Sequence, residues 1–103
     1  MVVDESADGQ SLTLAVGESL MVELAENPTT GFRWTLTSDG APACAASGES
    51  YEADQSTGLG RGGRHRWQFQ AAQPGRGTIA LSHSRPWEPG APGRTFSLSV
   101  TVQ

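Results

Sequence analysis

The sequence predicts an all-β protein: an immunoglobulin-like β-sandwich of about seven short strands, with three loops gathered at one end. Segments in which apolar and polar residues alternate recur along the chain at a spacing of about 8–12 residues, which is typical of such sandwiches. The 103 residues include 13 Gly and 6 Pro, a composition that suits a domain rich in turns. No segment shows the periodicity of an amphipathic helix.

Three strands are predicted in the first part of the chain. Their alternating apolar residues are Leu12, Leu14 and Val16, then Leu20, Val22 and Leu24, then Phe32, Trp34 and Leu36. Residues 1–10 are polar and acidic, and we expect them to form a flexible N-terminal lead-in. Residues 11–103 then form a single domain, which is large enough for one hydrophobic core.

The pattern is weaker in the middle of the chain and clear again toward its end. Ser38 to Ser50 is rich in small residues, so we expect a connection there, with at most a short edge strand or a turn of helix near residues 43–46. Residues 51–55 are weakly strand-like. Residues 65–71 alternate most clearly, and two more strands follow over residues 78–83 and 96–102. Because Trp34 and Trp67 lie inside alternating runs, we expect both in the core.

The single cysteine and the two histidines do not predict a catalytic or metal site. Cys44 cannot form an intrachain disulfide or a multi-cysteine metal site, and nothing around it is of the kind that lowers a thiol pKa. We expect it to be a small buried filler. His65 and His83 lie in strand-like segments, and their spacing from the carboxylates does not indicate a catalytic acid/base pair. The sequence therefore predicts no enzyme, no cofactor and no metal.

Composition also bears on partners and location. The net charge of −4, without a basic-aromatic repeat, argues against nucleic acid as a partner. The chain has no apolar window of membrane-spanning length and no signal peptide, so we expect no membrane span. The compartment stays unknown: secreted or periplasmic if a leader was removed, otherwise cytoplasmic. We expect a monomer.

The charges are divided unevenly along the chain. Residues 1–54 carry ten acidic residues against Arg33 alone, and residues 55–103 carry six arginines against Glu88 alone. Strands from the two halves interleave in a sandwich, so the division predicts pairing between oppositely charged strands. A second interpretation is that the later loops are locally positive and steer an acidic partner.

Three unusual loops, Asn27–Gly31, Gly58–Gly63 and Arg85–Gly90, separate predicted strands. If the strands are lettered A to G, these are the B–C, D–E and F–G connections, and the alternating strand direction places all three at one end. Pro28 stiffens the first, and the second offers a glycine backbone that a partner can approach closely. The third holds Trp87 in a segment with two prolines. These features predict a binding edge, although each loop alone is also compatible with an ordinary connection.

The three loops resemble the signature loops of the chagasin-type inhibitors of papain-family cysteine peptidases. They read Asn27-Pro28-Thr29-Thr30-Gly31-Phe32, Gly60-Arg61-Gly62-Gly63 and Arg85-Pro86-Trp87-Glu88. The likeness runs from about Leu12 to Val102 and includes Val16-Gly17-Glu18 and the Phe32-x-Trp34 start of the third strand. Arg61 is a departure, since it puts a large cation into a loop of small residues, and the connection at Ala41–Ser50 is another.

The resemblance implies a reversible, tight-binding, competitive inhibitor that occludes the peptidase cleft. The first loop would enter the catalytic centre with Thr29 nearest the thiolate, Gly60 to Gly63 would bind one wall through their backbone, and Arg85 and Trp87 would grip the opposite wall. The partner implied is a papain-family cysteine peptidase, endogenous or foreign. The alternative function is a non-inhibitory, immunoglobulin-like adhesion or targeting module that keeps the loops as a general recognition edge.

Overall fold

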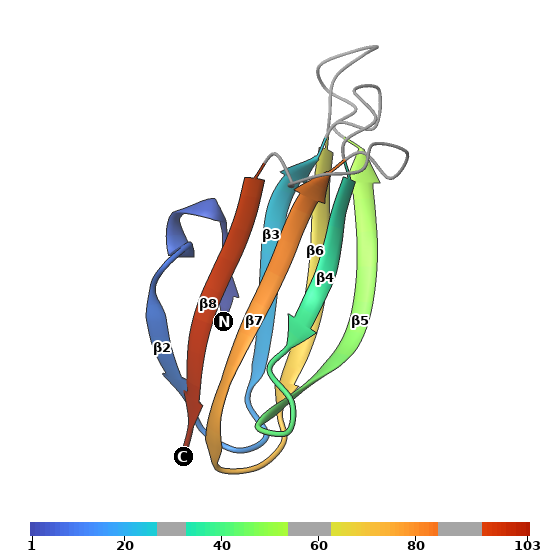
Figure 1. Ribbon diagram of the computed structural model, residues 1–103. Helices are drawn as coiled ribbons and strands as arrows, with labels where there is room; N and C mark the ends of the chain where they lie inside the picture. The colour runs from blue at the N-terminus through green and yellow to red at the C-terminus, as the bar shows by residue number, and fades with distance from the viewer. Residues whose placement is uncertain (27–32, 54–62, 85–93) are drawn as a thin grey trace.

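A computed structural model of the chain describes residues 1–26, 33–53, 63–84 and 94–103 (Figure 1). These residues form two four-stranded sheets packed face to face. The first sheet has the order β1-β3-β6-β5 and contains β1 (Val2–Val3), β3 (Ser19–Glu26), β5 (Cys44–Ala53) and β6 (Gly63–Ala71). The second has the order β2-β8-β7-β4 and contains β2 (Ser11–Leu14), β4 (Arg33–Asp39), β7 (Gly75–Ser84) and β8 (Arg94–Val102). The predicted all-β sandwich is confirmed.

The core lies between the sheets and follows the alternation of the sequence. Leu20, Val22 and Leu24 of β3 are fully buried, and Phe96, Leu98 and Val100 of β8 are at most 2% exposed. Removing side chains of this size from water stabilises a fold by about 1.5–3 kcal/mol each. Trp34 and Trp67 are 5% and 2% exposed, so their predicted place in the core is confirmed. Val16, expected on the first strand's apolar face, instead lies beyond the end of β2 and is 50% exposed.

The middle of the chain is more regular than the sequence suggests. Ser38 to Ser50 was expected to be a connection, yet β4 extends to Asp39 and β5 is a ten-residue strand that begins at Cys44. β5 pairs with β6 along its whole length, with an irregularity between Ala46 and Gly48. Its residues from Ala45 to Glu52 are exposed, which is why they show no apolar alternation. Pairing with a neighbour, and not burial of one face, makes this segment a strand.

Residues 1–10, for which we expected a flexible lead-in, contain β1 and the 3₁₀ helix η1 (Glu5–Ala7) in the structure. β1 pairs in parallel with β3, where Val2 is opposite Met21. The Gly9 N–H donates to the Ser97 carbonyl at 2.8 Å, and the Ser97 N–H donates to the Asp8 carboxylate at 2.9 Å. These bonds join the N-terminal residues to both sheets.

The strand ends that border the three undescribed segments, namely those of β3, β4, β5, β6, β7 and β8, lie at the same end of the sandwich (Figure 1). Within the first sheet, Gly63 is opposite both Glu26 and Ala53. Within the second, Arg33 is opposite Ser84, and His83 is opposite Arg94. These residues immediately flank the segments 27–32, 54–62 and 85–93, so each of the three segments begins and ends at this one end.

Candidate functional site

Most of the predicted site residues lie outside the described part of the chain. They are Asn27, Pro28, Thr29, Thr30, Gly31, Phe32, Gly60, Arg61, Gly62, Arg85, Pro86, Trp87 and Glu88. Gly63 is described: it is the first residue of β6 and is opposite Glu26. The described part of the candidate site consists of the residues at and near the strand ends that flank the three segments.

A cluster of side chains connects the two sheets at the end where those flanking residues lie. We call it the end cluster and define it as Glu26, Trp34, His65, His83 and Arg94. Its members come from five strands: two from β3 and β6 of the first sheet, and three from β4, β7 and β8 of the second.

Glu26 is the inward-facing last residue of β3, and only 5% of its surface is exposed. Its Oε2 accepts a hydrogen bond of 2.7 Å from the backbone N–H of Trp34, which lies in the opposite sheet. Its Oε1 lies 3.2 Å from Nδ1 of His65. Both carboxylate oxygens therefore have a partner, which is the condition under which a buried carboxylate is tolerated.

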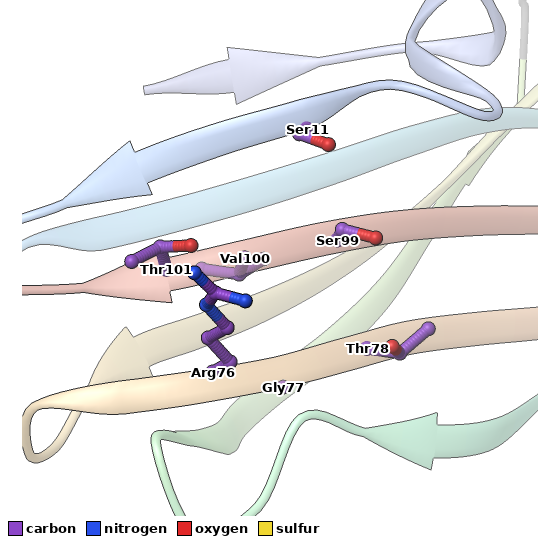
Figure 2. Close-up of a pocket in the computed structure, with 7 residues that line it drawn as sticks. All are labelled: Ser11, Arg76, Gly77, Thr78, Ser99, Val100 and Thr101. Atoms are coloured by element: carbon purple, nitrogen blue, oxygen red, sulfur yellow. The ribbon is translucent and has the colours of Figure 1, made fainter.

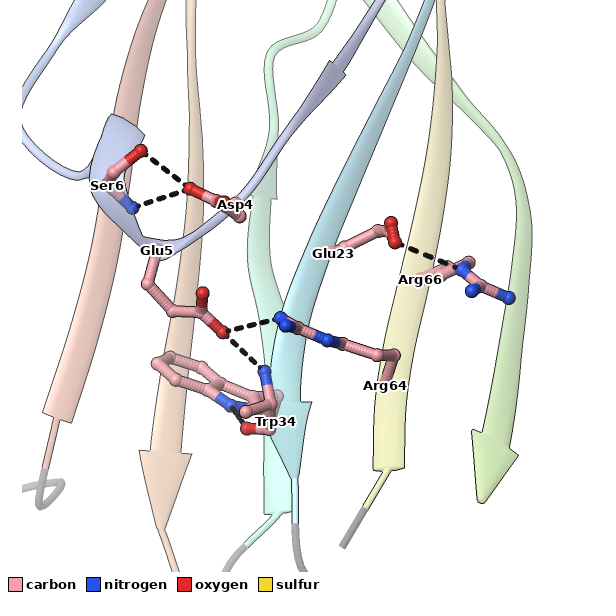
Figure 3. A network of polar contacts seen from close by, with 8 residues as sticks. Asp4, Glu5, Ser6, Glu23, Trp34, Arg64 and Arg66 are labelled. Carbon is pink, nitrogen blue, oxygen red and sulfur yellow. Dashed lines mark hydrogen bonds and ion pairs between the residues drawn. The ribbon is translucent and has the colours of Figure 1, made fainter. Parts of the chain in front are cut away.

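Trp34 connects the same strand end to β7 and β8. Its indole Nε1–H donates to the Ala25 carbonyl at 3.0 Å, a contact drawn in Figure 3. On its ring lies the imidazole of His83, with the ring centroids 4.7 Å apart, and the Arg94 guanidinium carbon is 5.8 Å from the ring centroid. Stacking and cation–π contacts of this kind add to the area burial of a tryptophan. Trp34 thus holds the strand ends on both sides of residues 85–93.

His65 ties the first sheet's strands together. Its ring stacks on Trp67 with centroids 3.9 Å apart, and its Nε2 lies 2.5 Å from a carboxylate oxygen of Glu49 in β5. Since Nδ1 faces Glu26, the two ring nitrogens each face a carboxylate. A neutral imidazole can donate to one of them and an imidazolium to both. The strands β3, β5 and β6 are joined through this one side chain.

Burial and charge affect the pKa of His83. Burial lowers its pKa, the nearby Arg94 guanidinium lowers it further, and Glu26 acts in the opposite direction. His83 is therefore held toward its neutral form. A neutral ring stacks on Trp34 without placing a second cation beside Arg94.

The sequence motifs predicted no role for Glu26 or His65. A signal was present for Glu26, because it continues the inward-facing series of Leu20, Val22 and Leu24 and directly precedes the first signature loop. A charged residue at an inward position next to a motif indicates a polar contact inside the fold. His65 gave a similar signal, because it begins the inward-facing series of Trp67, Phe69 and Ala71, but its partners could not be identified because they come from strands distant in the sequence.

The outer face of the first sheet carries cross-strand ion pairs. Arg64 Nη1 lies 3.3 Å from a Glu5 carboxylate oxygen, and Arg66 contacts Glu23 at 3.3 Å and Glu52 at 2.7 Å. Figure 3 shows Glu5 facing Arg64, and Glu23 facing Arg66. These pairs join acidic residues of the first half to arginines of the second. The predicted pairing between oppositely charged strands is confirmed for Arg66 of β6 with Glu23 of β3 and Glu52 of β5.

A shallow polar hollow lies on the outer face of the second sheet (Figure 2). Arg76 and the hydroxyls of Ser11, Thr78, Ser99 and Thr101 line it. Arg76 is opposite Thr101, near the ends of β7 and β8 that are remote from Ser84 and Arg94. The hollow contains none of the predicted site residues and is separate from the end cluster.

Cys44 is 1% exposed, as predicted for a buried filler. Burial raises the pKa of its thiol, and the nearby Asp39 raises it further, so the reactive thiolate is disfavoured. Within the described ranges, no group of His, Cys, Asp and Glu side chains has the arrangement of a metal site. No helix among the described residues is long and apolar enough to cross a membrane.

Comparison with known proteins identifies relatives along almost the whole chain. Residues 13–102 match the model of the chagasin family of peptidase inhibitors, I42. The sequence is 38% identical over 105 residues to Amoebiasin-1 of Entamoeba histolytica, covering 100% of both chains. It is 31% identical over 90 residues to Chagasin of Trypanosoma cruzi, covering 82% of this chain and 81% of that protein. The crystal structure of the cysteine protease inhibitor EhICP2 from Entamoeba histolytica superposes with a TM-score of 0.83 at 26% identity, covering 99% of this chain and 93% of the other.

Proposed function

The chain belongs to the chagasin family of cysteine peptidase inhibitors, and we propose how it inhibits its target. The relatives compared above are inhibitors and not enzymes. It is a reversible, tight-binding and competitive inhibitor of papain-like cysteine peptidases. Residues 27–32, 60–63 and 85–88 together occlude the active-site cleft. The partner is a papain-family peptidase, endogenous or foreign.

One structural observation carries this proposal. The strands that flank the three motif segments begin or finish at the same end of the sandwich. The end cluster connects these strands across both sheets. Segments anchored so close together can contact one partner at the same time. A standard protein–protein interface buries about 1,600 Å² in total, an area that three adjacent loops can supply.

Each segment has its own role in the proposed complex. Thr29 in the first enters the catalytic centre beside the thiolate of the peptidase. Gly60 to Gly63 lie along one wall and bind through backbone groups, for which small residues are suited. Arg85 and Trp87 contact the opposite wall, where Trp87 stacks on an aromatic side chain. No acyl-enzyme is needed, because the first segment need not present a scissile carbonyl to the thiolate.

The proposal is tested by titrating papain with the protein and following hydrolysis of a small fluorogenic peptide. We expect the apparent KM to rise while kcat is unchanged, which is the pattern of competitive inhibition. Activity should return after rapid dilution, and the mass of the inhibitor recovered from the complex should be that of the intact chain. Folded protein that leaves papain fully active at high excess would exclude the inhibitor proposal and leave the adhesion or targeting module as the alternative.

A further inference from the structure

Glu26 is the only charged residue among the described residues that is buried. It occupies an inward-facing position that continues the apolar series of Leu20, Val22 and Leu24. An apolar side chain would be buried there without loss of hydration. A carboxylate is acceptable only if hydrogen-bond donors are brought to both of its oxygens. The choice of residue therefore imposes a geometric requirement on the surrounding strands.

Two other strands meet that requirement, and a third contacts the Glu26 backbone. β4 supplies the Trp34 N–H at 2.7 Å, and β6 supplies His65, whose Nδ1 lies 3.2 Å from the carboxylate. From β5, the Tyr51 hydroxyl donates to the backbone carbonyl of Glu26 at 3.4 Å. Glu26 thus contacts the strand that follows residues 27–32 and both strands that flank residues 54–62.

We propose that Glu26 is a positioning residue for inhibition, whose buried carboxylate fixes the base of residues 27–32 relative to the base of residues 54–62. The inference rests on the proposed function, because the position of the two bases is expected to affect inhibition of the peptidase. The carboxylate is satisfied only when the Trp34 N–H of one sheet and His65 of the other reach it together. It therefore selects one relative placement of the sheets at this end, where apolar packing alone would accept several.

The chemistry of Glu26 provides two informative substitutions. Glu26→Gln keeps an oxygen that can accept from the Trp34 N–H and an amide that can donate to His65. Glu26→Leu has a similar volume and suits the apolar core, but it accepts nothing. We expect Glu26→Gln to inhibit papain within about threefold of the parent and Glu26→Leu to inhibit at least about tenfold more weakly, as the loss of a bond to a charged group predicts.

Glu23→Leu is the matched control. Glu23 lies on the same strand, but it faces outward and pairs with Arg66. The same substitution there should leave papain inhibition unchanged. Thermal unfolding of every variant shows whether it is folded, so that weaker inhibition at an unchanged melting temperature is separated from general loss of structure.

A second measurement uses the inhibitor alone. Hydrogen exchange of the Trp34 backbone amide, followed by NMR, reports directly on its bond to Glu26. Exchange should be at least about tenfold faster in Glu26→Leu than in the parent, and near the parental rate in Glu26→Gln and Glu23→Leu. If Glu26→Leu does not fold, His65→Phe tests the same carboxylate: it keeps a ring against Trp67, removes both nitrogens, and should weaken inhibition by about threefold or more.

The outcomes separate the two proposals. A parent that inhibits papain together with a folded Glu26→Leu of equal potency overturns the positioning role and leaves the proposed function intact. Unchanged inhibition by His65→Phe, where that variant is needed, also overturns it. A folded parent that does not inhibit papain overturns the proposed function. Hydrogen exchange of the Trp34 amide then decides alone whether Glu26 fixes the base of residues 27–32. Equal exchange rates in the parent and in Glu26→Leu reject that role.

Discussion

At the scale of single residues, Trp87 carries the clearest functional prediction, although it lies outside the described residues. An aromatic side chain at the centre of an interface is a typical hot spot, whose truncation costs about 2 kcal/mol or more. We expect Trp87→Ala to raise the inhibition constant for papain about thirtyfold or more, which is the equivalent of that free energy. Parental potency would remove Trp87 from the site, and an unchanged melting temperature would show that the fold is unaffected.

His83 gives a prediction for stability against pH. Burial and Arg94 lower its pKa below the ordinary value of 6.5, so the unfolded chain binds this proton more readily than the folded protein. Its contribution to stability is therefore fully present above about pH 6.5 and is lost as the pH falls through the lowered value. The groups that face it include Trp34, Arg94 and Glu26.

The measurement is urea unfolding at several pH values between about 7.5 and 5, for the parent and for His83→Gln. The free energy of unfolding should fall more steeply with decreasing pH in the parent, because the variant lacks this titrating group. Parallel curves would show that His83 is not held toward its neutral form. Comparing the slopes of the two proteins removes the contribution of the carboxylates, which both share.

At the scale of elements, the N-terminal residues offer a test of whether 1–10 is a flexible lead-in. Val3 and Ala7 pack against the core cluster, and Glu5 pairs with Arg64 and accepts from the Ala25 N–H at 2.6 Å. Because Ala25 directly precedes Glu26, this segment supports the same strand end as the end cluster. Deleting residues 1–9 should lower the free energy of unfolding by about 1–2 kcal/mol, from lost burial and hydrogen bonds.

Chemical denaturation of the truncated and full-length chains measures this difference. Equal stability would support a flexible lead-in that contributes nothing to the fold. As a control, the double variant Glu5→Gln, Arg64→Gln removes only the exposed ion pair, and pairs of this kind contribute about 0–1 kcal/mol. If the truncated chain loses no more free energy of unfolding than this double variant does, the packing of β1 does not contribute to stability.

At the scale of the whole molecule, acidic residues of the first half of the sequence form ion pairs with arginines of the second half. Arg64 and Arg66 of the second half lie against Glu5, Glu23 and Glu52 of the first, so these arginines leave little positive field to attract a partner. We expect the association rate with papain to change by no more than about threefold between ionic strengths of about 0.02 and 0.3 M. Stopped-flow fluorescence gives this rate, and a steep fall with salt would favour charge steering by the later loops.

Local features of the sequence predicted much of the fold. Apolar alternation is a property of neighbouring residues, so it located β3, β6, β8 and the buried tryptophans, and the order of the strands predicted that the three loops share one end. β5 escaped prediction because a strand exposed along its length needs only a partner for its backbone, and β6 is far away in the chain. The motif residues proposed for the site were recognised from their order and spacing, and they stay a prediction because nearly all of them lie outside the described residues.

What the sequence by itself determined is the fold class, the family resemblance and the three motif segments, because alternation, turn residues and motif spacing are written in consecutive residues. Only the tertiary structure decided that Glu26, His65 and Trp34 meet at one end of the sandwich. The physical reason is that a buried carboxylate is satisfied by donors from other strands, and which donors reach it depends on how the two sheets pack.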